Sequence, residues 1–436
     1  MSKHTLYPII LILFFALCTC NAQEMLTVRD AVNIALQNNY EIKIQENDLK
    51  VDSMGVGVAN AGMLPTVDAV LTSNNSIQNS SQTRSSGEIV ELDNAENNSL
   101  NYGVTLGWTL FDGFSMFARY NQLKEQRNLG EAEFQQTVLA RMSDVMVTYF
   151  DLVQQQQQLS ALDSTLVISK QRVDLAQNRF TIGKASKLEV LNAQVDLNTD
   201  QTTYLRQKES LANTKVQLNE ILARETDIDF MVSEDFDVDQ ALFLPMLQAE
   251  AKEENPSLKL QYINKRIAEL QLKQVKANRY PSVAASVGYN FSDSQSSLGF
   301  TTTSSARGWN YGFTARLNIF NGFLQHRNEK IANIQLKTSS LVIEQQSKAI
   351  ESQLAQAYQT YLTNISLIEL EKNNEAIAKE NLSITLDKFK IGTIPTIEFR
   401  TAQLNYINAV ARYNNALFQA KLSEITLKEI AGSLSI

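Results

Sequence analysis

The sequence contains one structural unit twice, and this duplication restricts the possible folds more than any other feature. Residues 178–183 (NRFTIG) resemble residues 387–392 (DKFKIG), 209 positions later. Further upstream the offset is 216, where Pro65 matches Pro281. The seven-residue difference therefore lies between Pro65 and Phe111, in a segment that tolerates a change of length. Such tolerance is typical of a loop, and the rest of the unit is predicted to fold in the same way twice.

Both units share one order of elements. Each is predicted to begin with a helix, to pass through a β-hairpin into a very long helix, and to return along another helix after a tight turn. The repeats are 23–224 and 247–432, separated by an acidic linker at 225–246. In the first repeat we expect an opening helix at 27–62, the hairpin at 65–111, the long helix at 113–182 and the return helix at 187–223. The corresponding elements of the second repeat are expected at 247–279, 281–320, 322–391 and 396–430.

The long helices are indicated by a scarcity of residues that interrupt helices. Only Gly130 occurs as Gly or Pro between Gly113 and Gly183, and neither residue type occurs between Gly322 and Gly392. At 1.5 Å per residue each run would span ~100 Å, so it needs lateral support. Apolar residues at spacings of three, four and seven predict that left-handed coiled-coil packing supplies it. In the first long helix they include Val138, Met142, Val145, Tyr149 and Leu152.

Strict alternation of apolar and polar residues predicts four β-strands in two hairpins. Every second residue from Leu100 to Leu110 is apolar, and the residues between them are Asn, Gly or Thr. The same period of two occupies 283–291 and 309–319, and 66–73 is a weaker partner for the first strand. We expect the polar runs at 73–99 and 292–306 to connect the strands.

The apolar side of these strands has no predicted partner within the chain. The neighbouring helices are too polar to cover it, whereas strands of about ten residues match a tilted span of an outer membrane. The opposite side, rich in Gly, Ser, Thr and Asn, suits a watery lumen. Lipid-facing and interfacial side chains are therefore expected at Tyr102, Leu106, Trp108, Tyr289, Trp309 and Phe313, with the two Trp near opposite interfaces. A β-sandwich with exposed aromatic residues is the alternative.

Four strands are too few to enclose a lumen, because the smallest transmembrane barrels have eight strands. Several chains must therefore contribute to one barrel. Two chains would give eight strands and a filled interior. Three chains would give twelve strands and leave room for a channel.

The N-terminus predicts export. A basic residue precedes the apolar run from Leu6 to Leu17, which is too short to span a bilayer, and small residues at Cys20 and Ala22 form a cleavage site. We expect a signal peptide at 1–22 that is cut after Ala22. The alternative is lipoprotein processing, with Cys20 as the acylated residue. No later segment has 18 consecutive apolar residues, so no transmembrane helix is expected.

Composition excludes several classes of function. With 2 His and 2 Cys the chain has little with which to build a zinc site, a haem site or a Cys–His nucleophile, so we expect no catalytic residue, cofactor or metal. The 39 Lys and Arg against 47 Asp and Glu offer no general basic surface for nucleic acid. Seven acids between Glu225 and Asp239 lack the turn glycine of a calcium loop, and we interpret them as a solvated linker.

The combination of motifs resembles the TolC-type outer-membrane efflux proteins. The resemblance covers 26–432 and rests on the signal peptide, the duplicated unit, the motifs at 111–114 (FDGF) and 320–323 (FNGF), and an acid after each Phe-x-Ile-Gly turn. It implies a mostly α fold with a membrane β-barrel: a homotrimer with one twelve-stranded barrel in the outer-membrane lipid of a Gram-negative bacterium and a long α-helical barrel in the periplasm. It also implies a passive export channel without enzyme activity, which docks to a periplasmic membrane-fusion adaptor served by a proton-driven or ATP-driven inner-membrane pump.

The turns at 180–189 and 389–398 are the predicted docking sites for the adaptor. Three chains would present six similar Gly-centred turns, which suits a partner built from repeated subunits. The two glycines are also expected to end their helices. The predicted docking residues are Gly183, Ala185, Gly392 and Thr393.

An acid follows each turn, and the resemblance places these acids, Glu189 and Glu398, at the pore constriction. Ser186 and Glu189 form a capping box, in which Glu189 reaches back to the Ser186 amide. Pro395 is expected at the first helical position, which puts Glu398 one residue beyond a capping-box site. Three Glu398 side chains would then form an anionic ring that favours cations.

The chain departs from some members of the family at two positions near this ring. Ile394 replaces an Arg and Thr401 replaces a second acid, so a gate built on those groups is not expected. Two alternative functions remain open. One is the same duct serving type I secretion of polypeptides, and the other is a periplasmic coiled-coil scaffold without a pore.

Overall fold

The computed structural model describes residues 24–234, 236–297 and 301–435, so the predicted signal peptide and Cys20 lie outside the described residues. The chain divides by its contacts into two compact units. One unit contains the chain up to Glu46, Glu133–Lys259 and Gln346–Ile436, and the other contains Asn47–Ala132 and Leu260–Gln345. Each unit therefore draws on both sequence repeats.

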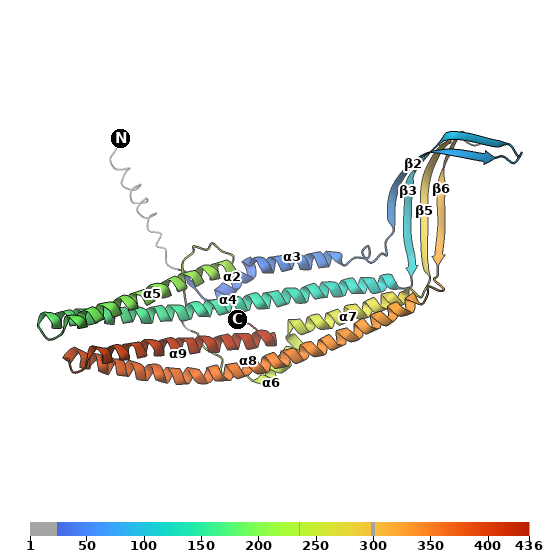
Figure 1. The fold of residues 1–436 in the computed structure, drawn as a ribbon. Helices are drawn as coiled ribbons and strands as arrows, with labels where there is room; N and C mark the ends of the chain where they lie inside the picture. Colours follow the sequence, from blue (N-terminus) through green and yellow to red (C-terminus); the bar gives the residue numbers. More distant parts are fainter. Residues whose placement is uncertain (1–23, 235, 298–300, 436) are drawn as a thin grey trace, which may run out of the picture. The chain divides into compact units, whose positions relative to one another are not determined.

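The second unit contains a four-stranded antiparallel sheet (Figure 1). Its strands are β2 (Thr66–Thr83), β3 (Ile89–Asp112), β5 (Ser282–Ser296) and β6 (Thr303–Arg316), in the order β2-β3-β5-β6. The two hairpins predicted from the alternation are confirmed, and β3 joins to β5 side by side. In that pairing Tyr102 lies opposite Phe291 and Leu106 lies opposite Val287. Both outer edges, β2 and β6, have no strand partner among the described residues of the single chain.

The strands are longer than the alternation predicted. Residues 73–83 continue β2, 89–99 form the first half of β3, and 292–296 extend β5, so the assignment of these polar runs to connecting loops is wrong. Their Ser, Thr, Asn and Gln residues pair in register, because a neighbouring strand satisfies the backbone whatever the side chains are. Polar side chains on both faces of a strand therefore show that this part lies outside an apolar environment. They do not show that the strand has ended.

The long helices and return helices are confirmed almost to the residue. They are α4 (Ser115–Thr181), α5 (Lys187–Ile221), α8 (Leu324–Ile391) and α9 (Thr396–Ala431). Among the described residues, no helix combines the length and the apolar composition needed to cross a membrane.

Each opening helix is broken in two, which the sequence prediction missed. The pieces are α2 (Val28–Asn38), α3 (Tyr40–Gly55), α6 (Leu244–Glu254) and α7 (Pro256–Ala277). A buried asparagine lies at each break and serves both sides of it. The Asn39 amide donates to the Ile221 carbonyl at 2.8 Å while its Oδ1 accepts from the Glu41 amide. Asn255 bonds Ile430 at 2.8 Å and the Leu258 amide in the same way, so the break is part of the duplicated unit.

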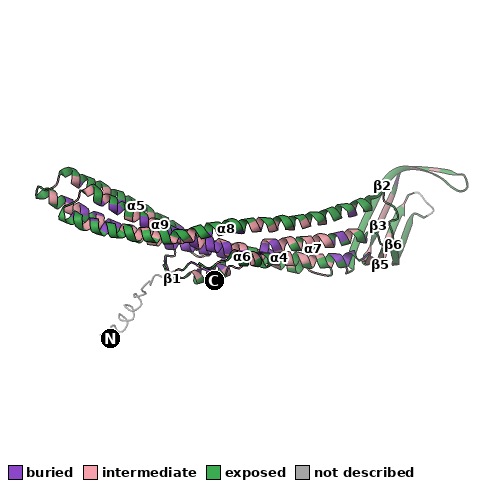
Figure 2. Ribbon diagram, turned by 90° about the horizontal axis from the view of Figure 1, so that it is seen from below, coloured by how far each residue is buried: buried purple, intermediate pink, exposed green. Residues whose placement is uncertain are grey.

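The core of the first unit forms around the middle of α4. Val145, Tyr149 and Leu152 of the predicted heptad pattern are buried there. Figure 2 shows buried segments, in purple, gathered in the middle part of the helices. The Tyr149 hydroxyl donates to the Leu26 carbonyl at 2.9 Å and accepts from the Ser233 amide at 3.1 Å. Burial raises the pKa of this phenol above its ordinary value. The apolar stripe of α4 therefore forms a core, and segments outside the helices, which include Leu26 and Phe230, pack into it.

The interpretation of 225–246 as a solvated linker is wrong, because part of this segment is buried in the core. Its strand β4 (Phe230–Val232) pairs in parallel with β1 (Glu24–Leu26), and Phe230 is fully buried. Strands of three residues are too short for a period to reveal them.

The second half of the linker is tied to α8 and α9 by charge and hydrogen bonds. The Asp239 amide donates to the buried carboxylate of Glu424 at 3.0 Å, and Tyr361 donates to the Asp239 carbonyl at 2.7 Å. A hydrogen bond from the Ala241 amide and the nearby Lys428 ammonium lower the pKa of the Asp239 carboxyl. The linker is therefore an anchored strap.

Candidate functional site: an apolar sheet face and two helical tips

One face of the sheet is apolar across all four strands and is not covered by its own chain. Cross-strand rows on this face are Ala69–Val104–Tyr289–Trp309, Val67–Leu106–Val287–Tyr311, Trp108–Ala285–Phe313 and, at its outer limit, Leu71–Tyr102–Phe291–Arg307. Phe313 is 78% exposed and Trp309 is 69% exposed. All six residues predicted to face lipid therefore lie on one face, and side chains of this size are rarely left in water in such numbers.

The aromatic residues on the apolar face contact one another. The Tyr102 and Phe291 rings stack with centroids 4.8 Å apart, and Tyr289 meets Trp309 edge to face at 5.2 Å. Trp309 lies in the row of Val104 while Trp108 lies four residues further along β3, a separation of about 14 Å. The two Trp thus occupy opposite halves of the apolar rows. Trp108 lies in the last of the apolar rows, whereas Trp309 lies one row inside the outer limit at Tyr102.

The opposite face of the sheet is built from small and polar residues. A Cβ on Gly103 would lie 2.2 Å from Asn290 Oδ1, and a Cβ on Gly288 would lie 2.9 Å from Thr105 Oγ1. Glycine is needed here because neighbouring strands place side chains over the backbone. The predicted division into an apolar face and a polar face is present in the geometry.

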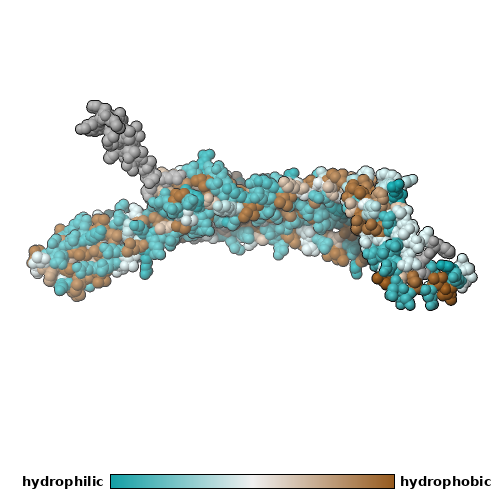
Figure 3. Space-filling model, turned by 90° about the horizontal axis from the view of Figure 1, so that it is seen from above, coloured by the Kyte–Doolittle hydropathy of each residue, from teal (hydrophilic) through white to brown (hydrophobic). Residues whose placement is uncertain are grey.

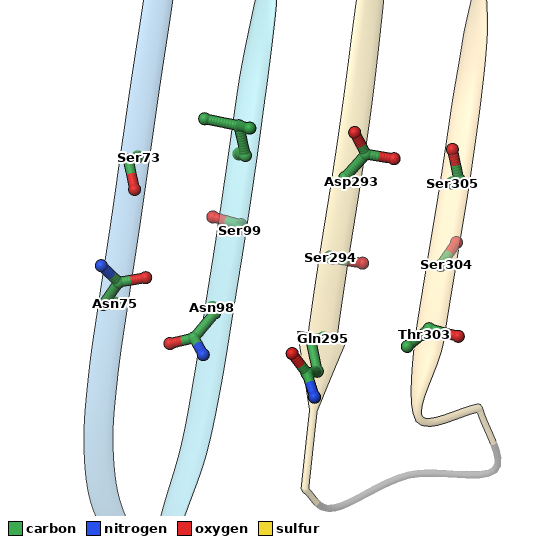
Figure 4. A pocket seen from close by; sticks show the side chains of 11 residues that line it. Ser73, Asn75, Asn98, Ser99, Asp293, Ser294, Gln295, Thr303, Ser304 and Ser305 are labelled. Carbon is green, nitrogen blue, oxygen red and sulfur yellow. The ribbon is translucent and has the colours of Figure 1, made fainter.

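Beyond the apolar rows the same face becomes polar. Figure 4 shows the side chains that line a shallow depression across all four strands there, among them Ser73, Asn98, Asp293 and Ser305. Ser73 on β2 and Asp293 on β5 both pair with Leu100 of β3, which lies one row beyond Tyr102. The apolar surface therefore has a sharp outer limit.

The duplicated Phe-x-Gly-Phe motifs make the same turn from strand to helix twice. Gly113 and Gly322 have positive φ angles of 69° and 64°, and so do the following Phe114 and Phe323, at 70° and 62°. A Cβ on Gly113 would lie 2.3 Å from the Ala277 carbonyl oxygen. In each motif the two rings meet edge to face, at 5.1 Å and 5.4 Å. The motif is therefore a packed corner of the backbone.

The two helical tips also share one geometry. Gly183 and Gly392 have φ angles of +75° and +84° and end α4 and α8, as predicted. Around each glycine lie exposed apolar side chains at corresponding positions of the repeats: Ile182 and Leu188 in the first tip, Ile391 and Ile397 in the second. Figure 3 shows apolar residues among polar ones over this end of the helices. Ala185 is half-buried and Thr393 is exposed.

The two tips are bound to each other within one chain. Thr396 of the second tip donates to the Glu189 carboxylate at 2.8 Å, and the Arg179 guanidinium lies over the Phe389 ring at 4.9 Å. Ser186 caps α5 by accepting from the Glu189 amide at 3.4 Å. Only that half of the predicted capping box forms, because the Glu189 carboxylate is engaged by the other tip.

Glu398 differs from Glu189 in its surroundings. Pro395 is the N-cap of α9 and not its first helical residue, so Glu398 takes the third helical position, contrary to prediction. A proline cap has no N–H for the carboxylate to accept from, and the Glu398 side chain is left exposed. Both predicted constriction acids thus lie at the tips, one bound and one exposed.

A buried ion-pair network, not predicted from the sequence, lies close to the tips. It joins Arg172 and Ser169 of α4, Asp196 and Asp200 of α5, and Arg400 and Gln403 of α9. Arg400 binds Asp200 through two hydrogen bonds of 2.8 Å. The only signal in the sequence is the spacing of four between Asp196 and Asp200. This spacing is also common on exposed helix faces, so it does not predict a buried network. No group of metal-binding side chains occurs within the described ranges.

The comparisons with known proteins agree with this geometry. The family described as outer membrane efflux protein matches residues 31–224 and 247–433, one match for each repeat. Protein CyaE of Bordetella pertussis is 21% identical over 418 residues, covering 94% of this chain and 84% of its own. Outer membrane protein TolC of Vibrio cholerae is 21% identical over 350 residues, covering 78% of each chain.

Solved structures share the fold. The Campylobacter jejuni CmeC outer membrane channel superposes with a TM-score of 0.76 at 17% identity, over 93% of this chain and 85% of its own. The outer membrane protein VceC of Vibrio cholerae gives 0.73 at 15% identity, over 93% and 96%. The predicted fold class, the outer-membrane location and the export function are confirmed. From its duplicated architecture and these matches, the chain belongs to the outer membrane efflux protein family.

Proposed function

We propose that three copies of this chain close their sheets into one twelve-stranded barrel that carries exported substrates through the outer membrane. The observation that carries the proposal is the combination of an exposed apolar face with two unpaired edges, β2 and β6, in one four-stranded sheet. Pairing β6 of one copy with β2 of the next satisfies both edges at once. It also turns every apolar row outward and every glycine-rich row toward a lumen.

The outward rows then contact lipid. Tyr102, Leu106, Tyr289 and Phe313 would face the acyl chains, and Trp108 and Trp309 would lie toward the two halves of the membrane. The polar rows that begin at Ser73 and Asp293 would lie beyond the membrane on the outer side. The same arrangement explains why the sheet stays polar on its inner face.

The tips would dock a periplasmic adaptor connected to an inner-membrane pump. The exposed pairs Ile182 with Leu188 and Ile391 with Ile397 support this assignment, since they are repeated and solvent-exposed in one chain. Gly183, Ala185, Gly392 and Thr393 would lie within that docking surface. The channel itself is proposed to be passive.

Glu398 is proposed to line the constriction. Its carboxylate is exposed, so that three copies could form an anionic ring that favours cations. Glu189 is the corresponding acid of the first repeat, and its bond to Thr396 of the second tip supports a place for it near the same proposed constriction.

Planar-bilayer recording of the purified full-length protein tests the proposal. A trimeric duct predicts stable single-channel conductance from a complex whose mass in detergent equals three chains. A scaffold without a pore predicts no conductance at any protein concentration, and that result would contradict the proposal.

A further inference from the structure

The ion-pair network near the tips is the strongest feature that the proposed function leaves unexplained. Two arginines and two aspartates meet there, and three of the four have little exposure to solvent: the side chain of Arg172 is 1% exposed, that of Asp200 is 8% and that of Arg400 is 12%, whereas that of Asp196 is 31% exposed. Buried ion pairs rarely add stability over a well-packed apolar contact. Their presence between three helices therefore calls for an explanation other than packing.

The network joins the two repeats, but the first repeat contributes three of its charged residues and the second contributes one. Arg172, Asp196 and Asp200 all belong to the first repeat, on α4 and α5, whereas Arg400 belongs to α9 of the second. Arg400 binds Asp200 with two hydrogen bonds and also lies 3.8 Å from Asp196. Gln403 adds a bond of 2.9 Å to Ser169. Arg400 is thus the main charged tie that holds α9 to the first repeat at this level.

Arg172 is only partly used in this arrangement. It pairs with Asp196 through Nη2, while its Nε and Nη1 are buried and have no hydrogen-bond partner among the described residues. Buried donors without partners are costly, and an arginine with two of them is unusual. Arg172 therefore has N–H donors left over that could donate to a second carboxylate.

The other aspartate of the network is Asp200. It already accepts a hydrogen bond of 2.6 Å from Ser169, which lies one turn from Arg172 on the same helix. Asp196 and Asp200 are themselves one turn apart on α5, so both face the same stretch of α4. If α9 withdrew with Arg400, the free donors of Arg172 could take over Asp200.

We propose that this network is an exchange latch, in which Asp200 passes from Arg400 to Arg172 when α9 moves away from the first repeat to widen the channel at its tips. The inference rests on the proposed function, since it assigns a moving part to that channel. Arg400 stabilises the arrangement seen here. Arg172 stabilises the alternative, because it keeps both aspartates paired after Arg400 has left.

Opposite effects of the two arginines test the latch. In planar bilayers, Arg400→Gln should raise the fraction of time spent in the high-conductance state by about tenfold, since a buried tie is lost from one state only. Arg172→Gln should lower that fraction several-fold, because the widened state then leaves Asp200 unpaired. Arg412→Gln is the matched control: Arg412 is also on α9, but its 3.0 Å pair with Glu371 is half-exposed and joins α9 to its own repeat, so the open fraction should change by less than about twofold.

A structural role would give a different result. If both arginines only stabilised the helices, both substitutions would shift the open fraction in the same direction, and that result or the absence of any shift would overturn the latch. Trimer mass in detergent is measured for each variant, and Arg400→Lys, which keeps the charge but loses the two-bond geometry, should fall between wild type and Arg400→Gln. A wild-type protein without conductance would instead contradict the proposed function.

Discussion

The sheet and the helical tips expose apolar side chains for different reasons, and the difference separates assembly from transport. On the sheet the apolar residues form continuous rows over four strands, from Leu71 to Phe313. At the tips they form small groups around a glycine, such as Phe180, Ile182 and Leu188. Continuous rows need a continuous apolar medium, whereas small groups suit a partner of limited size. Changes to the sheet should therefore prevent assembly, and changes to the tips should affect only what passes through.

The largest expected effect is on the sheet. Leu106→Arg places a charge in the middle of the apolar face and should cost roughly 2–4 kcal/mol per chain, because the charge must be desolvated. The matched variant is Thr105→Arg, whose side chain lies on the other face opposite Gly288 and points to water. The yield of trimer in the outer-membrane fraction should fall sharply for the first and little for the second. Equal yields would contradict the assignment of the faces.

Bulky substitutions at the tips should abolish export without changing the conductance of the pore. Ala185→Trp and Thr393→Trp enlarge the turns next to Gly183 and Gly392, where a partner would meet the chain. Cells carrying either variant should lose export, while the purified trimers keep wild-type conductance. Thr393→Ser, which preserves size, should export normally. Export that survives both Trp substitutions would move the docking surface elsewhere.

A smaller effect is expected within the tips themselves. Glu398 is exposed whereas Glu189 is held by Thr396, so only Glu398→Gln should strongly reduce cation selectivity and block by multivalent cations. Glu189→Gln should leave the selectivity largely unchanged. Single-channel recording in salt gradients compares the two, and equal losses, or no loss, would contradict the anionic ring.

The smallest effect lies outside both regions, in the strap around Asp239. The pKa of this carboxyl is lowered in the folded chain, so the carboxylate contributes stability above the ordinary pKa of Asp and loses it as the pH falls through the lowered value. Between about pH 5 and pH 3, hydrogen exchange corrected for its intrinsic rate should accelerate at residues 237–243. Asp239→Asn should remove this dependence on pH. Acceleration that is equally large in the sheet would show a global effect instead.

The sequence predicted those parts of the fold that rest on periodicity. The long helices, the hairpins and the positive-φ turns at Gly183 and Gly392 all follow from spacing or from a residue with one backbone role. It missed the break at Asn39, because that residue acts through a bond to Ile221, 182 positions away. It also missed the extensions of β2 and β3, whose polar side chains carry no period.

The candidate site was predicted less completely for a related reason. The residues of the apolar face could be named because successive side chains along a strand point to opposite faces of the sheet. The pairing of Arg400 with Asp200 could not, since it depends on how α9 packs on α5 across two repeats. The position of Pro395 was misjudged by one residue, which is enough to move Glu398 from one residue beyond the capping-box site to the third helical position itself.

Quenching of tryptophan fluorescence tests the central claim, contact between the apolar face and lipid, most directly. The chain has 2 Trp, and both Trp108 and Trp309 lie on that face. In the reconstituted protein, acyl chains brominated at different depths should quench both residues, while iodide in the water should not. The single-tryptophan variants Trp108→Phe and Trp309→Phe should place the two residues about 14 Å apart along the strands. Quenching by iodide without quenching by brominated lipid would contradict the account.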